Sequence, residues 1–195
     1  MDKQQLRLIL VLTVICVAAG AVLAWVNGLT EPRIEAVKEL KKQRMLQESL
    51  PAAVDFRTDA TLLQRARETI GPEICDLYLG FDDQGAPVGI VLTVESRGYG
   101  GPIQLMVGVA QNGRVTGISV LGHSETVGLG AKISEDDFLK QEALTGVTFE
   151  DTLAISKDHG KVQAVAGATI SSRAVVRGVN RGLAAARTVL NDERR

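Results

Sequence analysis

The stretch "ICDLYLGFDDQGAPVGIVLTVES", residues 74–96, contains two apolar, β-rich runs on either side of Gly85-Ala86-Pro87, which reads as a turn. Two further runs of the same kind follow, "IQLMVGVA" at 103–110 and "RVTGISVLGH" at 114–123. Asn112-Gly113 separates them, and Asn-Gly is a preferred dipeptide in hairpin turns. The pattern predicts an antiparallel sheet built from these segments.

Helical patterns lie on both sides of the strands. Residues 60–70 fit a short helix that Gly71-Pro72 ends, and "SEDDFLKQ", 134–141, fits another that Ser134 caps. Residues 172–190 fit a long C-terminal helix with one apolar stripe. Because helices flank the run of strands instead of alternating with them, we expect an α+β fold.

Small residues recur every fourth position in the C-terminal helix, at Ala174, Gly178, Gly182 and Ala186. A glycine inside a helix costs up to about 1 kcal/mol relative to alanine. Close packing of this helix onto the sheet would explain why two glycines stand there.

Residues 8–26, "LILVLTVICVAAGAVLAWV", carry no charge and end near Trp25. At about 1.5 Å per residue the run spans a hydrocarbon core of about 30 Å. We therefore predict a transmembrane helix over 8–27, after a cytoplasmic N-terminus at 1–7. A helical stalk with Thr30 as a helix cap would occupy 28–70, and a compact domain 71–195. A cleaved signal peptide is the alternative, since Ala19-Gly20-Ala21 resembles a cleavage site.

One face of the apolar run carries only small residues: Cys16, Gly20, Ala24 and Gly28. In lipid such a stripe lets a second helix approach closely. Small residues are also common in membrane helices generally, so both interpretations stand.

Charge and metal-ligand spacing exclude two classes of function. The net charge of −1 suggests no nucleic-acid partner. The two cysteines and two histidines show no metal-ligand spacing, so no metal site is expected.

The stretch "AVAGATISSRAVVRGV", 164–179, places a hydroxyl where a helix begins. Gly167 and Ala168 remove bulk beside Thr169, and Ser171 or Ser172 could cap the helix. Free amides and the positive end of the helix dipole would stabilise an anion there. An ordinary capped helix after a tight turn explains the same residues.

Two glycine-bearing stretches precede it. "GYGG", 98–101, interrupts a strand pattern and exposes Tyr99, while "HSETVGLG", 123–130, places polar groups on a loop directly after a strand. Glycine lets backbone approach a ligand closely. Gly128-Leu129-Gly130 is no dinucleotide fingerprint, because Ile133 stands where the third glycine belongs.

Gly167-Ala168-Thr169-Ile170-Ser171 resembles the flavinylation motif of the FMN-binding domain family, and "GYGG" and "HSETVGLG" match further family elements in the same order. The resemblance implies that a flavin transferase attaches FMN through its phosphate to the Thr169 hydroxyl as a phosphodiester. It also implies cofactor-binding roles for Gly98, Tyr99, Gly100, His123, Glu125, Thr126, Gly128, Leu129, Gly167, Ala168, Ser171 and Ser172. Gln163 and Ala166 depart from the family pattern, which often has an acid and Ser or Thr there.

One N-terminal membrane helix before a single such domain resembles the G subunits of Rnf-type (Rsx) electron-transport complexes. This implies a flavoprotein, with no catalytic residues or substrate site of its own, that relays electrons within an ion-translocating ferredoxin:NAD oxidoreductase. Its partners would be other membrane subunits of the complex. Its place would be the bacterial inner membrane, with the flavin domain on the periplasmic side.

Three alternatives remain from the sequence. The first is the C subunit of a sodium-pumping NADH:quinone reductase, which is usually longer. The second is a non-redox scaffold module for partner membrane subunits, and the third is a stand-alone extracytoplasmic flavin reductase.

Overall fold

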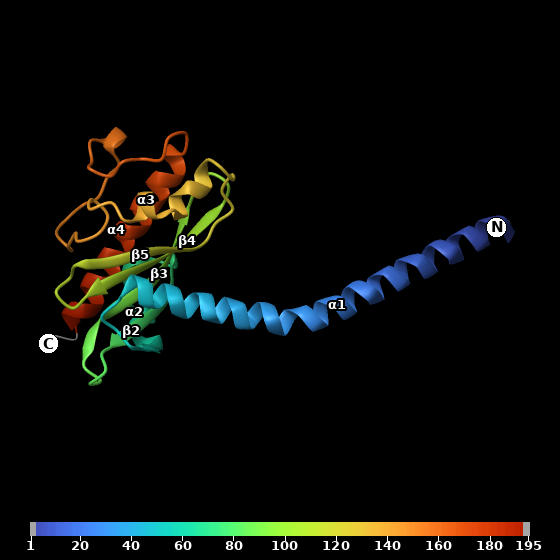
Figure 1. Cartoon of the computed structure of the whole chain (residues 1–195), viewed down its shortest axis with the longest axis horizontal. Helices are drawn as coiled ribbons and strands as arrows, with labels where there is room; N and C mark the ends of the chain where they lie inside the picture. Colours follow the sequence, from blue (N-terminus) through green and yellow to red (C-terminus); the bar gives the residue numbers. More distant parts are fainter. Residues whose placement is uncertain (1–2, 193–195) are drawn as a thin grey trace. The chain divides into compact units, whose positions relative to one another are not determined.

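The computed structural model describes residues 3–192, in two units that follow each other along the chain. The first unit extends to Lys42, and the second begins at Gln43. Helix α1 (Lys3–Ser49) supplies the described part of the first unit and the first residues of the second (Figure 1).

Among the described residues, α1 is the one helix long and apolar enough to cross a membrane, over Ile9–Ser49. The mean hydropathy of its most apolar 18-residue window is 2.7, and none of that window is buried. A core helix of a soluble domain would bury this surface, so its exposure suits a lipid environment.

Two details of α1 bear on the predictions from the sequence. The predicted helix start at Thr30 is wrong, because α1 is continuous there and the Thr30 hydroxyl donates to the carbonyl of Val26 at 2.8 Å. Ideal Cβ atoms on Gly20 and Gly28 would meet nothing within 4 Å in the described chain. The packing of this small-residue face on a partner helix stays a prediction.

The second unit contains a five-stranded antiparallel sheet in the order β1-β2-β3-β4-β5. The strands are β1 (Asp55–Thr58), β2 (Ile74–Phe81), β3 (Pro87–Arg97), β4 (Pro102–Ala110) and β5 (Val115–Gly122). The antiparallel sheet and the α+β class are confirmed. The four predicted strands are present, whereas β1 was missed because it is short and mostly exposed.

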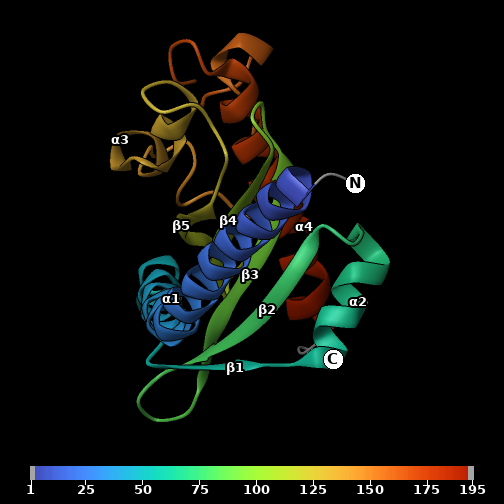
Figure 2. The same cartoon turned by 90° about the vertical axis from the view of Figure 1, so that its right-hand side faces the viewer.

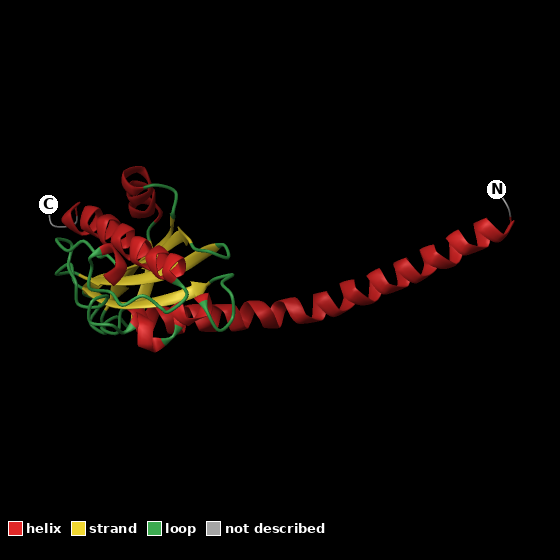
Figure 3. Cartoon of the chain, turned by 90° about the horizontal axis from the view of Figure 1, so that it is seen from above, coloured by secondary structure: helices red, strands yellow, loops and turns green. Residues whose placement is uncertain are grey.

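Helices α4 (Thr169–Asp192) and α2 (Ala60–Ile70) lie on the same face of the sheet (Figures 2 and 3). A Cβ on Gly182 would lie 3.2 Å from the Val107 side chain, and one on Gly178 would overlap the Leu105 side chain. The glycines therefore let α4 approach β4 closely, as their spacing predicted. Buried aliphatic side chains of β2 to β5 and α4 form the core between these layers.

The last turn of α1 covers part of the opposite face of the sheet. Met45 and Leu46 belong to a second buried cluster that includes Tyr78 and Met106. The carbonyl of Ser49 accepts a hydrogen bond from the Thr116 hydroxyl at 2.6 Å. The compact unit thus includes the end of α1, β1 and α2, all upstream of residue 71.

Three short helical segments connect β5 to α4: η1 (Gly130–Ser134), α3 (Asp136–Leu139) and η2 (Ser156–Asp158). The predicted Ser134 cap is wrong, because Glu135 occupies the N-cap position of α3 and makes no side-chain cap bond. The Ser134 hydroxyl donates instead to the carbonyl of Ala131 at 2.7 Å, inside the preceding 3₁₀ turn.

Candidate functional site

Three segments that are distant in the sequence meet at the N-terminal end of α4. They are the β3–β4 turn at 98–101, the loop after β5 at 123–130, and residues 167–171, which comprise the turn before α4 and its first residues. A cavity of about 420 Å³ lies between them, within the range of about 300–1,000 Å³ that is typical of small-molecule sites. We call it the α4 cavity; it is lined by Tyr99, Glu125, Thr126, Leu129, Gly130, Gly167, Ala168, Thr169, Ile170 and Ser171.

Glu125 links all three segments. Its side chain is buried, and its Oε1 accepts hydrogen bonds from the amides of Tyr99 at 2.8 Å and Gly100 at 3.1 Å. Its Oε2 accepts from the Ser171 hydroxyl at 2.7 Å. A buried carboxylate needs such donors, and bonds to an ionised acceptor are stronger than neutral ones. The carboxylate therefore fixes the two loops to the start of α4.

The glycines of these loops make room for that carboxylate. A Cβ on Gly130 would lie 2.5 Å from Glu125 Oε2 and 3.1 Å from Ser171 Oγ, and one on Gly98 would overlap Glu125 Oε1. Gly167 serves a different need, since its φ of 77° lies in the left-handed region that favours glycine.

Helix α4 begins at Thr169, so the predicted start near 172 with a serine cap is wrong. The amide of Ser172 donates to the carbonyl of Ala168 at 2.9 Å, which makes Ala168 the capping position. The Ser172 hydroxyl accepts from the Val165 amide and donates to the Ala168 carbonyl, both at 3.0 Å. Because alanine has no side-chain acceptor, it leaves the first-turn amides available to an anion.

Thr169 is half-buried on the wall of the α4 cavity, and its hydroxyl accepts a hydrogen bond from Lys157 Nζ at 2.9 Å. Lys157 lies in η2. Asp158, in the same turn, accepts two hydrogen bonds of 2.7 Å from the Arg173 guanidinium. These bonds hold the pKa of Asp158 below its usual value and raise the pKa of Arg173.

Large apolar side chains stand exposed around the α4 cavity. Tyr99, Leu129 and Ile170 are 73%, 50% and 48% exposed, and the neighbouring Val127 is 90% exposed. In the described part of the second unit, Val54 is the only other large apolar residue exposed to this degree. The α4 cavity thus combines buried polar groups with an apolar rim.

All but one of the predicted site residues divide into two groups. Those that line the α4 cavity are Tyr99, Glu125, Thr126, Leu129, Gly167, Ala168, Thr169 and Ser171. Those that support its walls without lining it are Gly98, Gly100, His123 and Ser172, whereas Gly128 does not line it and a Cβ there would meet nothing within 4 Å. His123 Nδ1, for example, accepts from the Glu125 amide at 3.2 Å.

Sequence reasoning missed Gly130, Ile170 and Lys157. The first two stand inside the quoted motifs and could have been included with their neighbours. Lys157 carried no signal, because it lies 12 residues before Thr169 in a loop without a motif.

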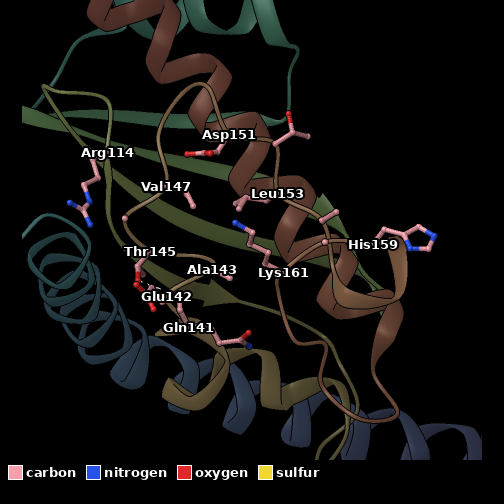
Figure 4. Close-up of a pocket in the computed structure, with 14 residues that line it drawn as sticks. Arg114, Gln141, Glu142, Ala143, Thr145, Val147, Asp151, Leu153, His159 and Lys161 are labelled. Carbon is pink, nitrogen blue, oxygen red and sulfur yellow. Dashed lines mark hydrogen bonds between the residues drawn. The ribbon is translucent and has the colours of Figure 1, made fainter.

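A larger cavity of about 790 Å³ lies between Arg114, just before β5, and the loops over 141–147 and 151–161 (Figure 4). Its charged lining residues include Arg114, Asp151 and Lys161, and Leu153 is the one buried residue among those that line it. No residue of the three motifs lines it. Within residues 3–192 no group of three or more His, Cys, Asp or Glu side chains could hold a metal ion.

Known proteins resemble this chain over most of its length. The FMN-binding domain family matches residues 98–184, and the RnfG N-terminal region matches residues 1–48. The G subunit of the ion-translocating oxidoreductase complex of Methanosarcina acetivorans is 33% identical over 90% of this chain and 90% of its own length. The G subunit of the Na(+)-translocating ferredoxin:NAD(+) oxidoreductase complex of Acetobacterium woodii is 34% identical over 91% of this chain and 89% of its own length.

Two solved structures share the fold. Shewanella oneidensis NqrC aligns with a TM-score of 0.52 at 23% identity, over 75% of this chain and 73% of its own. The C subunit of the Na(+)-translocating NADH-quinone reductase of Parabacteroides distasonis aligns with a TM-score of 0.57 at 17% identity, over 77% of this chain and 91% of its own. At these identities the likeness is one of fold.

An FMN-binding domain, matched over residues 98–184, follows a long, apolar N-terminal helix. The family resemblance predicted from the three motifs is confirmed. The chain belongs to the RnfG family, the G subunits of Rnf-type ion-translocating oxidoreductase complexes.

Proposed function

We propose that this chain is a membrane-anchored flavoprotein that carries FMN attached through its phosphate to Thr169 and relays electrons within an ion-translocating complex. The observation that carries the proposal is the position of Thr169, whose hydroxyl stands on the wall of the α4 cavity at the first residue of α4. The relatives that are named as members of such complexes support the same role.

The residues of the α4 cavity suit FMN in three respects. The absence of a Cβ on Gly130 keeps space beside Glu125 and Ser171. The first-turn amides of α4 suit a phosphate. Tyr99, Leu129 and Ile170 offer apolar surface to a flat ring, and an aromatic ring gains from offset stacking. When bound, FMN supplies the redox chemistry, while the protein supplies binding, orientation and local charge.

The proposal includes partners and a location. A flavin transferase would modify Thr169, and other membrane subunits of the same complex would pack around α1. The exposed apolar helix supports a single-pass anchor in the bacterial inner membrane. We place the flavin domain on the periplasmic side.

Intact mass of the purified full chain tests the attachment. We expect the mass of one esterified FMN after production together with a flavin transferase, and flavin fluorescence that survives denaturation. Thr169→Ala should lose both, and Thr169→Ser should keep part of the label because it retains a hydroxyl. Thr188→Ala is the matched control, since Thr188 lies on the same helix and its hydroxyl donates only to the Ala184 carbonyl. Undiminished labelling of Thr169→Ala would refute the assignment.

A reporter fused to the C-terminus tests the orientation. We expect activity from a reporter that works only outside the cytoplasm. Activity from one that works only inside would reverse the topology. A mature protein that begins near Val22 would reveal a cleaved signal peptide instead of an anchor.

A further inference from the structure

Lys157 contacts the atom to which the flavin would be attached. Its Nζ donates a hydrogen bond of 2.9 Å to Thr169 Oγ1, although the lysine side chain is exposed and could point into solvent. An exposed lysine loses side-chain entropy when it is held in one position. Its position at Thr169 therefore depends on how firmly the surrounding loop is held.

The loop that carries Lys157 is closed at its base by buried residues. Ile155 and Val162 are fully buried and form a β-bridge with each other. The amide of Ser156 donates to the carbonyl of Val162 at 2.8 Å, and the amide of Gly160 donates to that of Ile155 at 2.9 Å. These contacts anchor both ends of the loop in the core.

An ion pair fixes the tip of the loop to α4. Arg173 lies one helical turn after Thr169, and its guanidinium binds both carboxylate oxygens of Asp158. A bidentate pair fixes orientation as well as distance. Lys157, the residue before Asp158, is thereby held at the first residue of α4.

The same ion pair leaves the charge of Lys157 without a carboxylate partner. The Asp158 carboxylate is engaged by Arg173, and no carboxylate in residues 3–192 forms a salt bridge with Lys157. The ammonium therefore adds its positive charge to that of the α4 N-terminus at Thr169 Oγ1.

We propose that Lys157 is the residue that binds the flavin phosphate, a role that rests on the proposed attachment at Thr169. Before attachment its ammonium contacts the acceptor hydroxyl. After attachment it contacts an oxygen of the phosphodiester and neutralises its single negative charge.

The attachment step defines what Lys157 can and cannot do. Thr169 Oγ1 attacks the phosphorus of a flavin nucleotide that is activated as a phosphoanhydride. An Oγ1–P bond forms, the anhydride P–O bond breaks, and a nucleoside monophosphate leaves. The hydroxyl proton passes to a base of the transferase, because Lys157 is a donor to this hydroxyl. Lys157 stabilises negative charge on the phosphoryl oxygens.

The experiment compares full-length wild-type chain with Lys157→Met, Lys157→Arg and Lys161→Met. Lys161 is an exposed lysine close by in the sequence that lines the larger cavity, so its variant controls for a general loss of surface charge. Two quantities are measured: the initial rate of flavin incorporation by intact mass, at low and high salt, and the ³¹P chemical shift of the attached phosphodiester.

We expect Lys157→Met to lower the incorporation rate roughly 1.5- to 5-fold at low salt, the range for one exposed charge pair, and to move the ³¹P resonance. High salt should bring the wild-type rate toward that of the variant. Lys157→Arg should retain most of the rate, and Lys161→Met should match wild type in both measurements.

Labelling of Lys157→Met at the wild-type rate with an unchanged ³¹P resonance would overturn the inference. So would equal losses in Lys157→Met and Lys161→Met, since these would point to overall charge. If Lys157→Met labels normally while Thr169→Ala does not label, only this inference fails. If wild-type chain remains unlabelled by an active transferase, the attachment proposal fails and the role of Lys157 fails with it.

Discussion

The two cavities of the second unit differ in how firmly their walls are held. The larger cavity, about 790 Å³, is lined mainly by exposed or half-buried residues of one continuous stretch, 141–161. The α4 cavity, about 420 Å³, has four buried residues in its wall: Glu125, Gly130, Ala168 and Ser171. A binding site needs groups that are already in position, because ordering them on binding costs free energy. The smaller cavity meets this requirement better.

The hydrogen bonds of the acidic side chains that line the two cavities explain this difference. Glu125 joins residues that lie 25, 26 and 46 positions away in the sequence. The larger cavity also has long-range bonds, from the Leu153 amide to Asn180 and from the Gln163 amide to Gln141. Its Asp151 carboxylate, however, accepts hydrogen bonds from the amide and hydroxyl of Thr148, three residues away, and so joins no separate segments. Long-range bonds fix segments relative to one another, whereas local bonds shape a single turn. Polar groups held across the sequence identify a site better than volume does.

The strongest test of this comparison removes the central carboxylate. Glu125→Ala would leave the amides of Tyr99 and Gly100 and the Ser171 hydroxyl without their acceptor. We expect the free energy of unfolding to fall by about 2–3 kcal/mol, and flavin incorporation to fall with it. Chemical denaturation measures the first quantity and intact mass the second. Glu142→Ala, in the larger cavity, should change stability by less than about 0.5 kcal/mol. Equal losses in both variants would remove the distinction between the cavities.

A smaller effect is expected from a single added methyl group. Gly130→Ala would place a Cβ 2.5 Å from Glu125 Oε2 and 2.9 Å from Glu125 Cβ. We expect a loss of about 1–2 kcal/mol in stability, at the lower end of the range for overpacking. Gly122→Ala is the control, because a Cβ there meets nothing within 4 Å. Thermal melting of both variants measures the effect. An unaltered melting temperature in Gly130→Ala would show that the loop rearranges around the added methyl group without loss of stability.

Acid should weaken two carboxylate interactions, one beside the start of α4 and one in the larger cavity, because both carboxyl groups have lowered pKa values. Asp158 has its pKa lowered chiefly by the Arg173 hydrogen bond, and Asp151 by hydrogen bonds from Thr148. A depressed folded-state pKa contributes stability above the unfolded value of about 3.9, and this is lost as pH falls through the folded value. Stability should therefore decrease below about pH 4, and less steeply in Asp158→Asn or Asp151→Asn. Thermal melting across this pH range measures the effect.

Of these two carboxylates, only Asp158 should also influence flavin attachment. Because Asp158 positions the Lys157 loop, Asp158→Asn should slow incorporation even at neutral pH, where Asp151→Asn should not. Equal incorporation rates in the two variants would show that the ion pair with Arg173 does not position Lys157.

The smallest effect is expected in the larger cavity itself. Arg114→Gln removes an exposed charge that lines this cavity and does not line the α4 cavity. We expect a change in unfolding free energy within about 0.5 kcal/mol and unchanged flavin incorporation. A clear loss of incorporation would show that the two cavities are coupled.

The features that the sequence predicted are those with a local pattern. The strands of residues 74–122 show as apolar runs between turn residues, and the spacing of Gly178 and Gly182 indicates a helix that packs closely on the sheet. The glycine motifs were recognisable as loops. Each of these depends on residues within about one turn or one strand of each other.

The features that the sequence did not predict depend on distant contacts or on weak local signals. The start of α4 at Thr169 follows from the Ser172 hydroxyl bonding to the Val165 amide and the Ala168 carbonyl, which competes with a capping role. The link from Glu125 to Ser171 and the contact from Lys157 to Thr169 join residues that no local pattern relates. β1 is too short and exposed for a period-two pattern to identify it.

The place of Thr169 at the first residue of α4 has a consequence for how tightly the cavity must bind. The glycine face of α4 lies against β4, so the proposed attachment point belongs to a rigid element. A group joined to a fixed point by a short flexible chain experiences an effective concentration in the millimolar range at a neighbouring surface. An apolar rim of modest affinity then suffices to keep a flavin ring in place most of the time. With the proposed attachment at Thr169, the ring could leave that rim and return without being lost from the protein.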